Sequence, residues 1–325
     1  MAGCVSPIRV TLDRAGEEEA APNYLARFHF SAEGSEPASG PDRMLALPTV
    51  DGRAVCEQWQ VAAPVEHEAR GGFKYSFGGG YAVISWSGAR SGSIRTQARE
   101  VYGALLPMTR ELGYESIVKL WNYVPEINRG EGDCEVYRQF CLGRGQIFDD
   151  LWGARVMPAG TAVGAPAGAP LQIILLAQGP GVSAVENPRQ TSAYHYPKQY
   201  GPHSPSFSRG AIAASDQLFV SGTASIVGHE SRHAGCLGDE IAETGRNWQV
   251  LLQQAAKQHS GPAHHAARTE ALRVYLRDPD AYAEAADALS VSGFPANKAL
   301  FLAADICRRE LLFEIDGVIG YAAKA

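Results

Sequence analysis

The sequence lacks the features of a membrane or exported protein. Its longest apolar stretch, residues 171–177, is far too short to cross a bilayer. The first residues show no basic segment followed by an apolar run, so we expect no secretion signal. The six cysteines include no CxxC pair, which argues against a disulfide framework and against a zinc ribbon. These absences predict a cytoplasmic protein that contacts no membrane.

An excess of positive charge is also missing. The 325 residues carry a formal net charge of −6 and have a pI near 5.9, so the chain offers no electrostatic footprint for nucleic acid. A hydrophobic content of 45% with 20% charged residues is ordinary for a globular protein. The length fits two domains or one large one. An anionic ligand would therefore need a locally positive pocket.

One segment departs from this ordinary composition, residues 187–210 in the stretch ENPRQTSAYHYPKQYGPHSPSFSRG. Its repeated prolines prevent an uninterrupted helix or an inner strand, so we expect a long, shaped loop. Its tyrosines and basic side chains suit an anionic, partly flat ligand, because cations bind carboxylates and phenols donate hydrogen bonds. The alternative is a linker packed against the surface.

Strand and helix patterns alternate along most of the chain. Strands are expected at residues 8–12, 61–64, 73–77, 81–86, 116–123, 171–178, 217–221, 271–276 and 311–319. Helices are expected at residues 93–113, from residue 135 onwards, at 239–258 and at 278–289. The GGG at residues 78–80 predicts a hairpin turn, and residues 160–170 form a stretch rich in glycine, alanine and proline.

This order of elements occurs twice, which predicts an α/β (α+β) fold of two pseudo-symmetric units. We expect one domain at residues 1–180, including an N-terminal extension, and a second at residues 181–325. The loop at residues 187–210 then lies where the units meet, and ligand pockets commonly form at such interfaces.

Three motifs carry possible chemistry. The sequence His229-Glu230-Ser231-Arg232-His233 satisfies the zinc motif HExxH, but neighbouring glycines and the absence of helical periodicity favour an exposed loop. Glu314 lies in an apolar strand, where it either faces solvent or points into a cleft as a proton donor with a raised pKa. Cys307 is either a core residue or, beside two arginines, a polarised thiol.

Three segments together indicate a family. In their order and spacing, ENPRQTSAYHYPKQYGPHSPSFSRG, LFVSGTASIVGHESRH and CRRELLFEIDG resemble the chorismatase family. The second half of the chain is also similar to the Rid (YjgF-type) fold, whose trimers place ligand sites between subunits. Two Rid-like units supply two thirds of such a trimer, and N-terminal elements are expected to supply the rest. The resemblance therefore implies a pseudo-trimeric single chain that acts as a monomer.

The resemblance implies that chorismate loses pyruvate without a cofactor or a metal ion. Glu314 would protonate the enol ether of the substrate. We expect Arg209 and Tyr200 to bind one substrate carboxylate, and Arg138 with Tyr194 to bind the other. Arg144 is expected near the same cleft.

The product depends on the step after protonation. The cysteine at position 307 implies a hydroxybenzoate-forming member that excludes water, with Gly222 and Ala224 shaping the pocket. An alanine at position 224 departs from a pure 3-hydroxybenzoate former, so 4-hydroxybenzoate and the hydrolytic product, a dihydroxycyclohexadiene carboxylate, stay open. The alternative from another class is a Rid-like imine deaminase or small-ligand binding protein.

Overall fold

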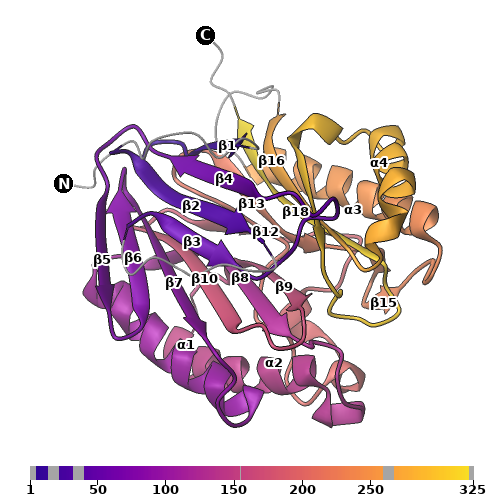
Figure 1. Cartoon of the computed structure of the whole chain (residues 1–325), viewed down its shortest axis with the longest axis horizontal. Coiled ribbons are helices and arrows are strands. Elements are labelled where there is room, and N and C mark those ends of the chain that lie inside the picture. Colours follow the sequence, from indigo (N-terminus) through magenta and orange to yellow (C-terminus); the bar gives the residue numbers. More distant parts are fainter. Residues whose placement is uncertain (1–4, 14–21, 32–39, 154, 259–266, 322–325) are drawn as a thin grey trace.

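The computed structural model describes residues 5–13, 22–31, 40–153, 155–258 and 267–321. It contains three main β-sheets (Figure 1). The first six-stranded sheet has the order β5-β6-β7-β10-β8-β9. Its strands are β5 (Glu66–Arg70), β6 (Phe73–Gly78), β7 (Tyr81–Gly88), β8 (Ser116–Pro125), β9 (Ala159–Ala165) and β10 (Leu171–Gln178). Helices α1 (Ile94–Glu111) and α2 (Val136–Ile147) cover one face of this sheet.

The second six-stranded sheet has the order β11-β12-β13-β18-β16-β17. Its strands are β11 (Ser183–Val185), β12 (Gly210–Ile212), β13 (Gln217–Thr223), β16 (Ala267–Leu276), β17 (Ala299–Ala303) and β18 (Phe313–Tyr321). Helices α3 (Leu237–Gln258) and α4 (Tyr282–Val291) pack on its outer face. A small hairpin of β14 (Ile226–Val227) and β15 (Glu230–Ser231) projects between β13 and α3.

The third sheet is formed near the N-terminus and has four strands in the order β1-β4-β2-β3. They are β1 (Arg9–Asp13), β2 (Tyr24–Phe30), β3 (Asp42–Leu45) and β4 (Val55–Gln60). The four strands β1-β4-β2-β3 recur in the same order as β7-β10-β8-β9 and as β13-β18-β16-β17, so that in each set the strand last in the chain lies second across the sheet. The second and third strands are parallel each time, as in β2/β3, β8/β9 and β16/β17.

This repeated topology confirms the pseudo-symmetric α/β fold expected from the sequence. The N-terminal elements expected to complete the pseudo-trimer form a third unit, whose described residues, 9–13, 22–31 and 40–60, include no helix. The boundary expected at residue 180 falls between the two six-stranded sheets, and a division into two domains there stays a prediction. No described helix is long and apolar enough to cross a membrane.

The inner faces of all three sheets share one core, because a single cluster of buried residues draws on β2, β4, β8, β13 and β16. Two buried ion pairs connect different units within it. Arg273 on β16 pairs with Glu57 on β4 at 2.6 Å, and Lys119 on β8 lies 3.6 Å from Asp316 on β18. Arg273 also stacks over the Trp121 ring at 4.9 Å. Charge and aromatic packing therefore fix how the units meet.

Local signals explain most of the boundaries. Helix α1 begins after Ser93, whose hydroxyl accepts a hydrogen bond from Thr96 N–H, and the chain reverses at Gly113 with φ 83°. The hairpin expected at residues 78–80 is confirmed, since Gly78 pairs with Tyr81. The strand expected at residues 61–64 is wrong, because β4 ends at Gln60 and the chain turns there.

The stretch at residues 160–170 contains an element that its composition concealed. Its first half belongs to strand β9, which pairs in parallel with β8. A Cβ atom at Gly160 would lie 2.8 Å from Phe207 Cβ, and one at Gly164 would lie 2.6 Å from Asp305 Cβ. The glycines are therefore needed because the loop and the neighbouring unit approach this strand closely.

Candidate active site

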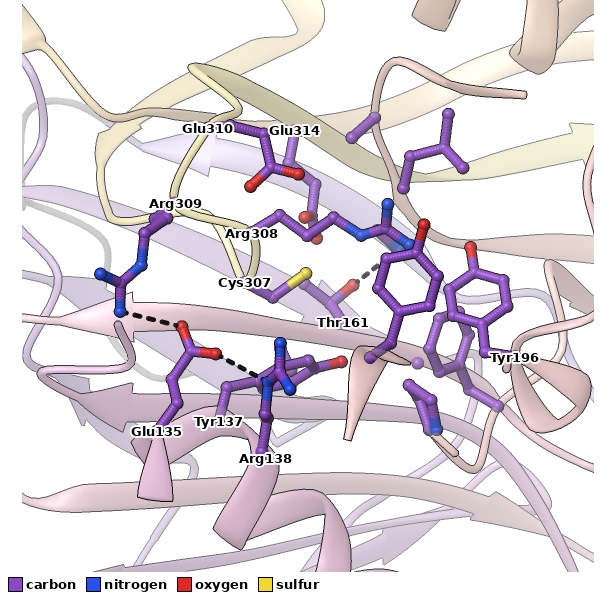
Figure 2. A pocket seen from close by; sticks show the side chains of 18 of the residues that line it. Glu135, Tyr137, Arg138, Thr161, Tyr196, Cys307, Arg308, Arg309, Glu310 and Glu314 are labelled. Carbon is purple, nitrogen blue, oxygen red and sulfur yellow. Dashed lines mark hydrogen bonds and ion pairs between the residues drawn. The ribbon is translucent and has the colours of Figure 1, made fainter. Parts of the chain in front are cut away.

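A cavity of about 430 Å³ opens where β9 of the first six-stranded unit faces β13 and β18 of the second (Figure 2). The loop at residues 187–210 forms one wall, and α2 and residues 307–310 form others. The lining residues are Glu135, Tyr137, Arg138, Arg144, Gly160, Thr161, Ala162, Tyr196, Gln199, Tyr200, Pro205, Phe207, Arg209, Gly222, Ala224, Ile226, Cys307, Arg308, Arg309, Glu310 and Glu314. Most of the residues expected from the sequence thus come together in one place.

Glu314 provides the acidic group of the cavity. It lies on β18, is 4% exposed and lines the cavity, so its side chain does not face solvent. Burial, with the nearby Asp316 charge, raises the pKa of Glu314 to about 8, against the opposing effect of Lys119 and Arg209. Near neutral pH the carboxyl group is therefore mostly protonated and can donate a proton.

The backbone at Gly222 leaves the room that this carboxyl group needs. A Cβ atom at that position would collide with Glu314 Oε1. The Gly222 N–H donates to Thr161 Oγ1 at 3.0 Å, which fixes β13 against β9. Gly222 thus shapes the cavity by its lack of a side chain.

A buried polar network lies beneath the acid. Thr161 Oγ1 donates to Asp316 Oδ2 at 2.6 Å, and Lys119 Nζ donates to Thr161 Oγ1 at 2.8 Å. Trp121 and Tyr275 also donate to Asp316, each at 3.1 Å. Because Thr161, Trp121 and Tyr275 all donate to Asp316, the network fixes this side chain two residues after Glu314 on β18.

Arg209 places a buried cation beside the acid. The side chain is 3% exposed, and it donates to Thr191 O and to Tyr196 Oη, both at 2.7 Å. Its guanidinium lies 5.5 Å from the ring centres of Tyr196 and Phe207. Its Nε is buried without a hydrogen-bond partner, and its charge opposes the rise in the pKa of the nearby Glu186 and Glu314 carboxyl groups. The loop therefore presents a cation with unused binding capacity.

Arg144 is a second such cation, which the sequence places near the cleft without giving it a role. It is 2% exposed, lines the cavity and has a buried Nε with no partner among the described residues. Arg138, assigned this role from the sequence, instead pairs with Glu135 at 3.2 Å and with Asp133 at 3.5 Å. Helical spacing could have identified Arg144 from the sequence, because Phe140 and Cys141, four and three residues earlier, lie on the buried face of α2.

The tyrosines of the loop divide in an unexpected way. Tyr200 lines the cavity and contacts His229 Nδ1 through its hydroxyl at 3.2 Å. Tyr194 is not among the lining residues, and its ring packs edge-on against His195 with the ring centres 4.6 Å apart. Tyr196 takes the place in the cavity, because a short 3-10 turn at residues 193–195 rotates the chain between the two positions.

Cys307 lines the same cavity but is not an activated thiol. Burial and the neighbouring Glu314 raise the pKa of Cys307, and Arg308 only partly opposes this effect. Arg309 turns away and donates to the backbone oxygens of Asn128 and Gly130, both at 2.7 Å. The raised pKa argues against the polarised thiol, and Cys307 lies as a small side chain on the cavity wall.

The HExxH match lies on the β14/β15 hairpin, where Val227 pairs with Glu230. The motif requires both histidines on one face of a helix, so the expectation of a loop is confirmed. His229 instead contacts Tyr200 at the edge of the cavity. His233 lies 3.5 Å from the Glu243 carboxylate, on the far side of the hairpin.

Comparison with known proteins agrees with this geometry. Residues 57–177 match the family model described as chorismatase FkbO/Hyg5-like, N-terminal. A 3-hydroxybenzoate synthase of Streptomyces hygroscopicus is 32% identical over 274 residues, which cover 81% of each chain. A chorismatase of Streptomyces hygroscopicus is 31% identical over 278 residues, covering 83% of this chain and 81% of the relative.

The likeness extends to the whole backbone. A chorismatase crystal structure superposes with a TM-score of 0.86 at 27% identity, covering 97% of this chain and 99% of the other. The arrangement of the units around one core is thus common to both proteins, and the chain is a member of the chorismatase family.

Proposed function

We propose that the protein converts chorismate to 3-hydroxybenzoate and pyruvate. One observation carries the proposal: the buried carboxyl group of Glu314 shares a cavity with the buried guanidinium groups of Arg144 and Arg209, each of which has an Nε without a hydrogen-bond partner among the described residues. Chorismate has two carboxylates and an acid-sensitive enol ether. A site that binds chorismate needs two cations and a proton donor, and this cavity contains all three groups.

The two arginines bind the substrate in this proposal. Arg209 on the loop binds one carboxylate, with the hydroxyl groups of Tyr196 and Tyr200 nearby. Arg144 on α2 replaces Arg138 as the partner of the other. Charge-assisted hydrogen bonds of this kind are about twice as strong as neutral ones, and a buried guanidinium loses little freedom when it forms them.

Glu314 then starts the reaction. It transfers its proton to the methylene carbon of the enol ether and leaves an oxocarbenium-like centre on the pyruvyl side chain. A neutral acid in a dry cavity is the right donor, because the charge that develops is not dispersed by water. Asp316 and Lys119, in the network beneath, act on the pKa of this acid in opposite directions, because the charge of Asp316 raises it and that of Lys119 lowers it.

The next step decides the product. Without water, one chorismate yields one hydroxybenzoate and one pyruvate, with all atoms conserved. If water attacks instead, one water molecule is consumed and a dihydroxycyclohexadiene carboxylate forms. The neutral thiol of Cys307 lines the cavity and fills space that water could otherwise occupy. This packing supports the hydroxybenzoate branch.

The test is incubation of the purified protein with chorismate, with pyruvate followed by a coupled dehydrogenase and the aromatic product identified by chromatography. We expect equimolar pyruvate and 3-hydroxybenzoate. Absence of pyruvate would refute the proposal. Pyruvate accompanied by 4-hydroxybenzoate or the diene would retain the chorismatase activity and overturn the choice of product.

We also propose that the protein acts as a monomer in a reducing cytoplasm. The three-unit topology supports the monomer, because the four-stranded sheet fills the place of a third subunit. Free thiols at Cys56, Cys134, Cys141, Cys236 and Cys307 support the compartment. Light scattering should give the mass of one chain, and an obligate trimer of whole chains would contradict this.

A further inference from the structure

Arg308 joins three segments at the edge of the cavity. It follows Cys307 directly and lies between the loop at residues 187–210 and the β14/β15 hairpin, as Figure 2 shows for its position beside Tyr196. Its Nη2 donates to His229 O at 2.8 Å and its Nη1 donates to Ser231 Oγ at 3.0 Å, both on the hairpin. One side chain thus holds the hairpin to the segment that carries Cys307.

The same guanidinium also holds the loop. Its carbon lies 4.0 Å from the centre of the Tyr200 ring and 5.3 Å from that of Tyr196. A cation over an aromatic face is attracted by the ring electrons, more strongly where water is excluded. Arg308 forms no ion pair with a described carboxylate, so the rings and the hairpin oxygens are its partners.

Further contacts close the wall around this residue. The Tyr200 hydroxyl reaches His229 Nδ1 at 3.2 Å, and Ser231 Oγ donates to Glu310 Oε1 at 2.7 Å. The loop contains only short 3-10 turns and the hairpin has two-residue strands. The backbones of the loop and the hairpin pair at the bridge between Gln190 and Gly228, where Gly228 N–H donates to Arg189 O and Thr191 N–H donates to Gly228 O, both at 2.8 Å. Arg308 adds side-chain contacts that connect both segments to the chain beside Cys307.

We propose that Arg308 is a positioning residue that clamps this wall shut and thereby sets the product. The inference rests on the proposed function, because it concerns the cation formed after Glu314 gives up its proton. With the wall closed, water is absent and the substrate's own atoms complete the reaction to hydroxybenzoate. With the wall open, water adds to the oxocarbenium carbon and the hemiketal collapses to pyruvate and the diene diol.

The partition between products separates this role from a merely structural one. A structural tie affects stability and the rate of both branches together. A clamp changes the ratio of diene to hydroxybenzoate while pyruvate is still released, because protonation by Glu314 comes before the step at which water competes. Arg308→Ala removes the stacking and both hydrogen bonds, whereas Arg308→Lys keeps a cation over the rings but not the forked geometry.

The experiment measures pyruvate, hydroxybenzoate and diene for the wild type, Arg308→Ala, Arg308→Lys and the control Arg232→Ala. Arg232 lies on the same hairpin, but its side chain is 50% exposed and pairs with Glu230. We expect Arg308→Ala to raise the ratio of diene to hydroxybenzoate by about tenfold, corresponding to about 1.4 kcal/mol between the competing barriers. Pyruvate release should stay within severalfold, Arg308→Lys should be intermediate, and the control should match the wild type.

An unchanged product ratio in folded Arg308→Ala would overturn the clamp, and so would a loss of all pyruvate release, which would place Arg308 in substrate binding. If Arg308→Ala does not fold, Ser231→Ala decides, since it removes one partner of Arg308 and should shift the ratio in the same direction by a smaller factor. A wild type that releases no pyruvate would instead refute the proposed function itself.

Discussion

At the scale of single residues, the cavity is organised by charge that the protein leaves unpaired. Arg144 and Arg209 are buried and each has an Nε without a hydrogen-bond partner among the described residues, whereas Arg138 nearby is paired with Glu135 and Asp133. Burial of a cation without a partner is costly. In the proposed function, the two carboxylates of chorismate supply the partners of these arginines.

This contrast gives a test with an internal control. Arg144→Ala and Arg209→Ala should each raise KM for chorismate by about 10-fold to 100-fold, since a hydrogen bond to a charged group contributes about 1.5–3 kcal/mol. Arg138→Ala removes the same charge from the same wall and should change KM by less than about threefold, because this guanidinium is already paired with Glu135 and Asp133. Steady-state kinetics decide, and equal effects at positions 138 and 144 would contradict the assignment.

Replacing Cys307 should change the identity of the product more than the rate of the reaction. Its thiol is neutral and fills the cavity wall, so Cys307→Ala opens space without removing the proton donor. We expect the product to shift from 3-hydroxybenzoate toward the diene or 4-hydroxybenzoate, while pyruvate release stays within about tenfold of the wild type. Chromatography of the products measures this. The same products in the same ratio would make Cys307 a core residue only.

At the scale of elements, β13 holds its active-site geometry through a glycine. Gly222→Ala should displace the Glu314 carboxyl group and lower kcat by about a hundredfold or more, the cost of losing a general acid. Gly238→Ala in α3 is the matched control, because nothing lies within 4 Å of the added methyl group. Kinetics and thermal unfolding should show an inactive but folded first variant, and wild-type kcat in Gly222→Ala would refute the role of Gly222.

The elements also show how much of the structure can be predicted from the sequence. The strand expected at residues 171–178 forms β10, because a buried apolar run between turn signals leaves few alternatives. Strand β9 could not be recognised from the sequence, because its glycines at positions 160 and 164 are required by close contacts with Phe207 and Asp305, which are distant in the chain. The sequence also could not show that Tyr196 lines the cavity in place of Tyr194, because a 3-10 turn inside the loop determines which ring faces the cavity.

At the scale of the whole molecule, three sheets of matching topology enclose one core. Composition could not reveal the third unit, because its β2 and β3 have no helix between them among the described residues to mark the repeat. The units are connected by buried ion pairs, of which Arg273 with Glu57 joins the second six-stranded sheet to the four-stranded one. The N-terminal unit is therefore part of the folded core and not an appendage.

Breaking that pair should destabilise the entire chain. Glu57→Gln leaves the guanidinium of Arg273 buried without its carboxylate, which typically costs about 3–5 kcal/mol. Urea unfolding followed by tryptophan fluorescence should show one transition at a lower midpoint, since Trp59 of the four-stranded sheet packs against Trp121 of the first six-stranded sheet. Independent unfolding of the N-terminal sheet, with the remainder intact, would contradict a shared core.

The central claim is that Glu314 acts as a buried acid, and the pH dependence of kcat tests it most directly. The pKa of Glu314 is raised to about 8 and the reaction uses the protonated form. We therefore expect kcat to be constant below this pKa and to fall tenfold per pH unit above it. Glu314→Gln should bind chorismate and turn over at least about a hundredfold more slowly, and its kcat should no longer fall at alkaline pH. Near-wild-type turnover in Glu314→Gln, or the same alkaline limb in its residual activity, would contradict the account.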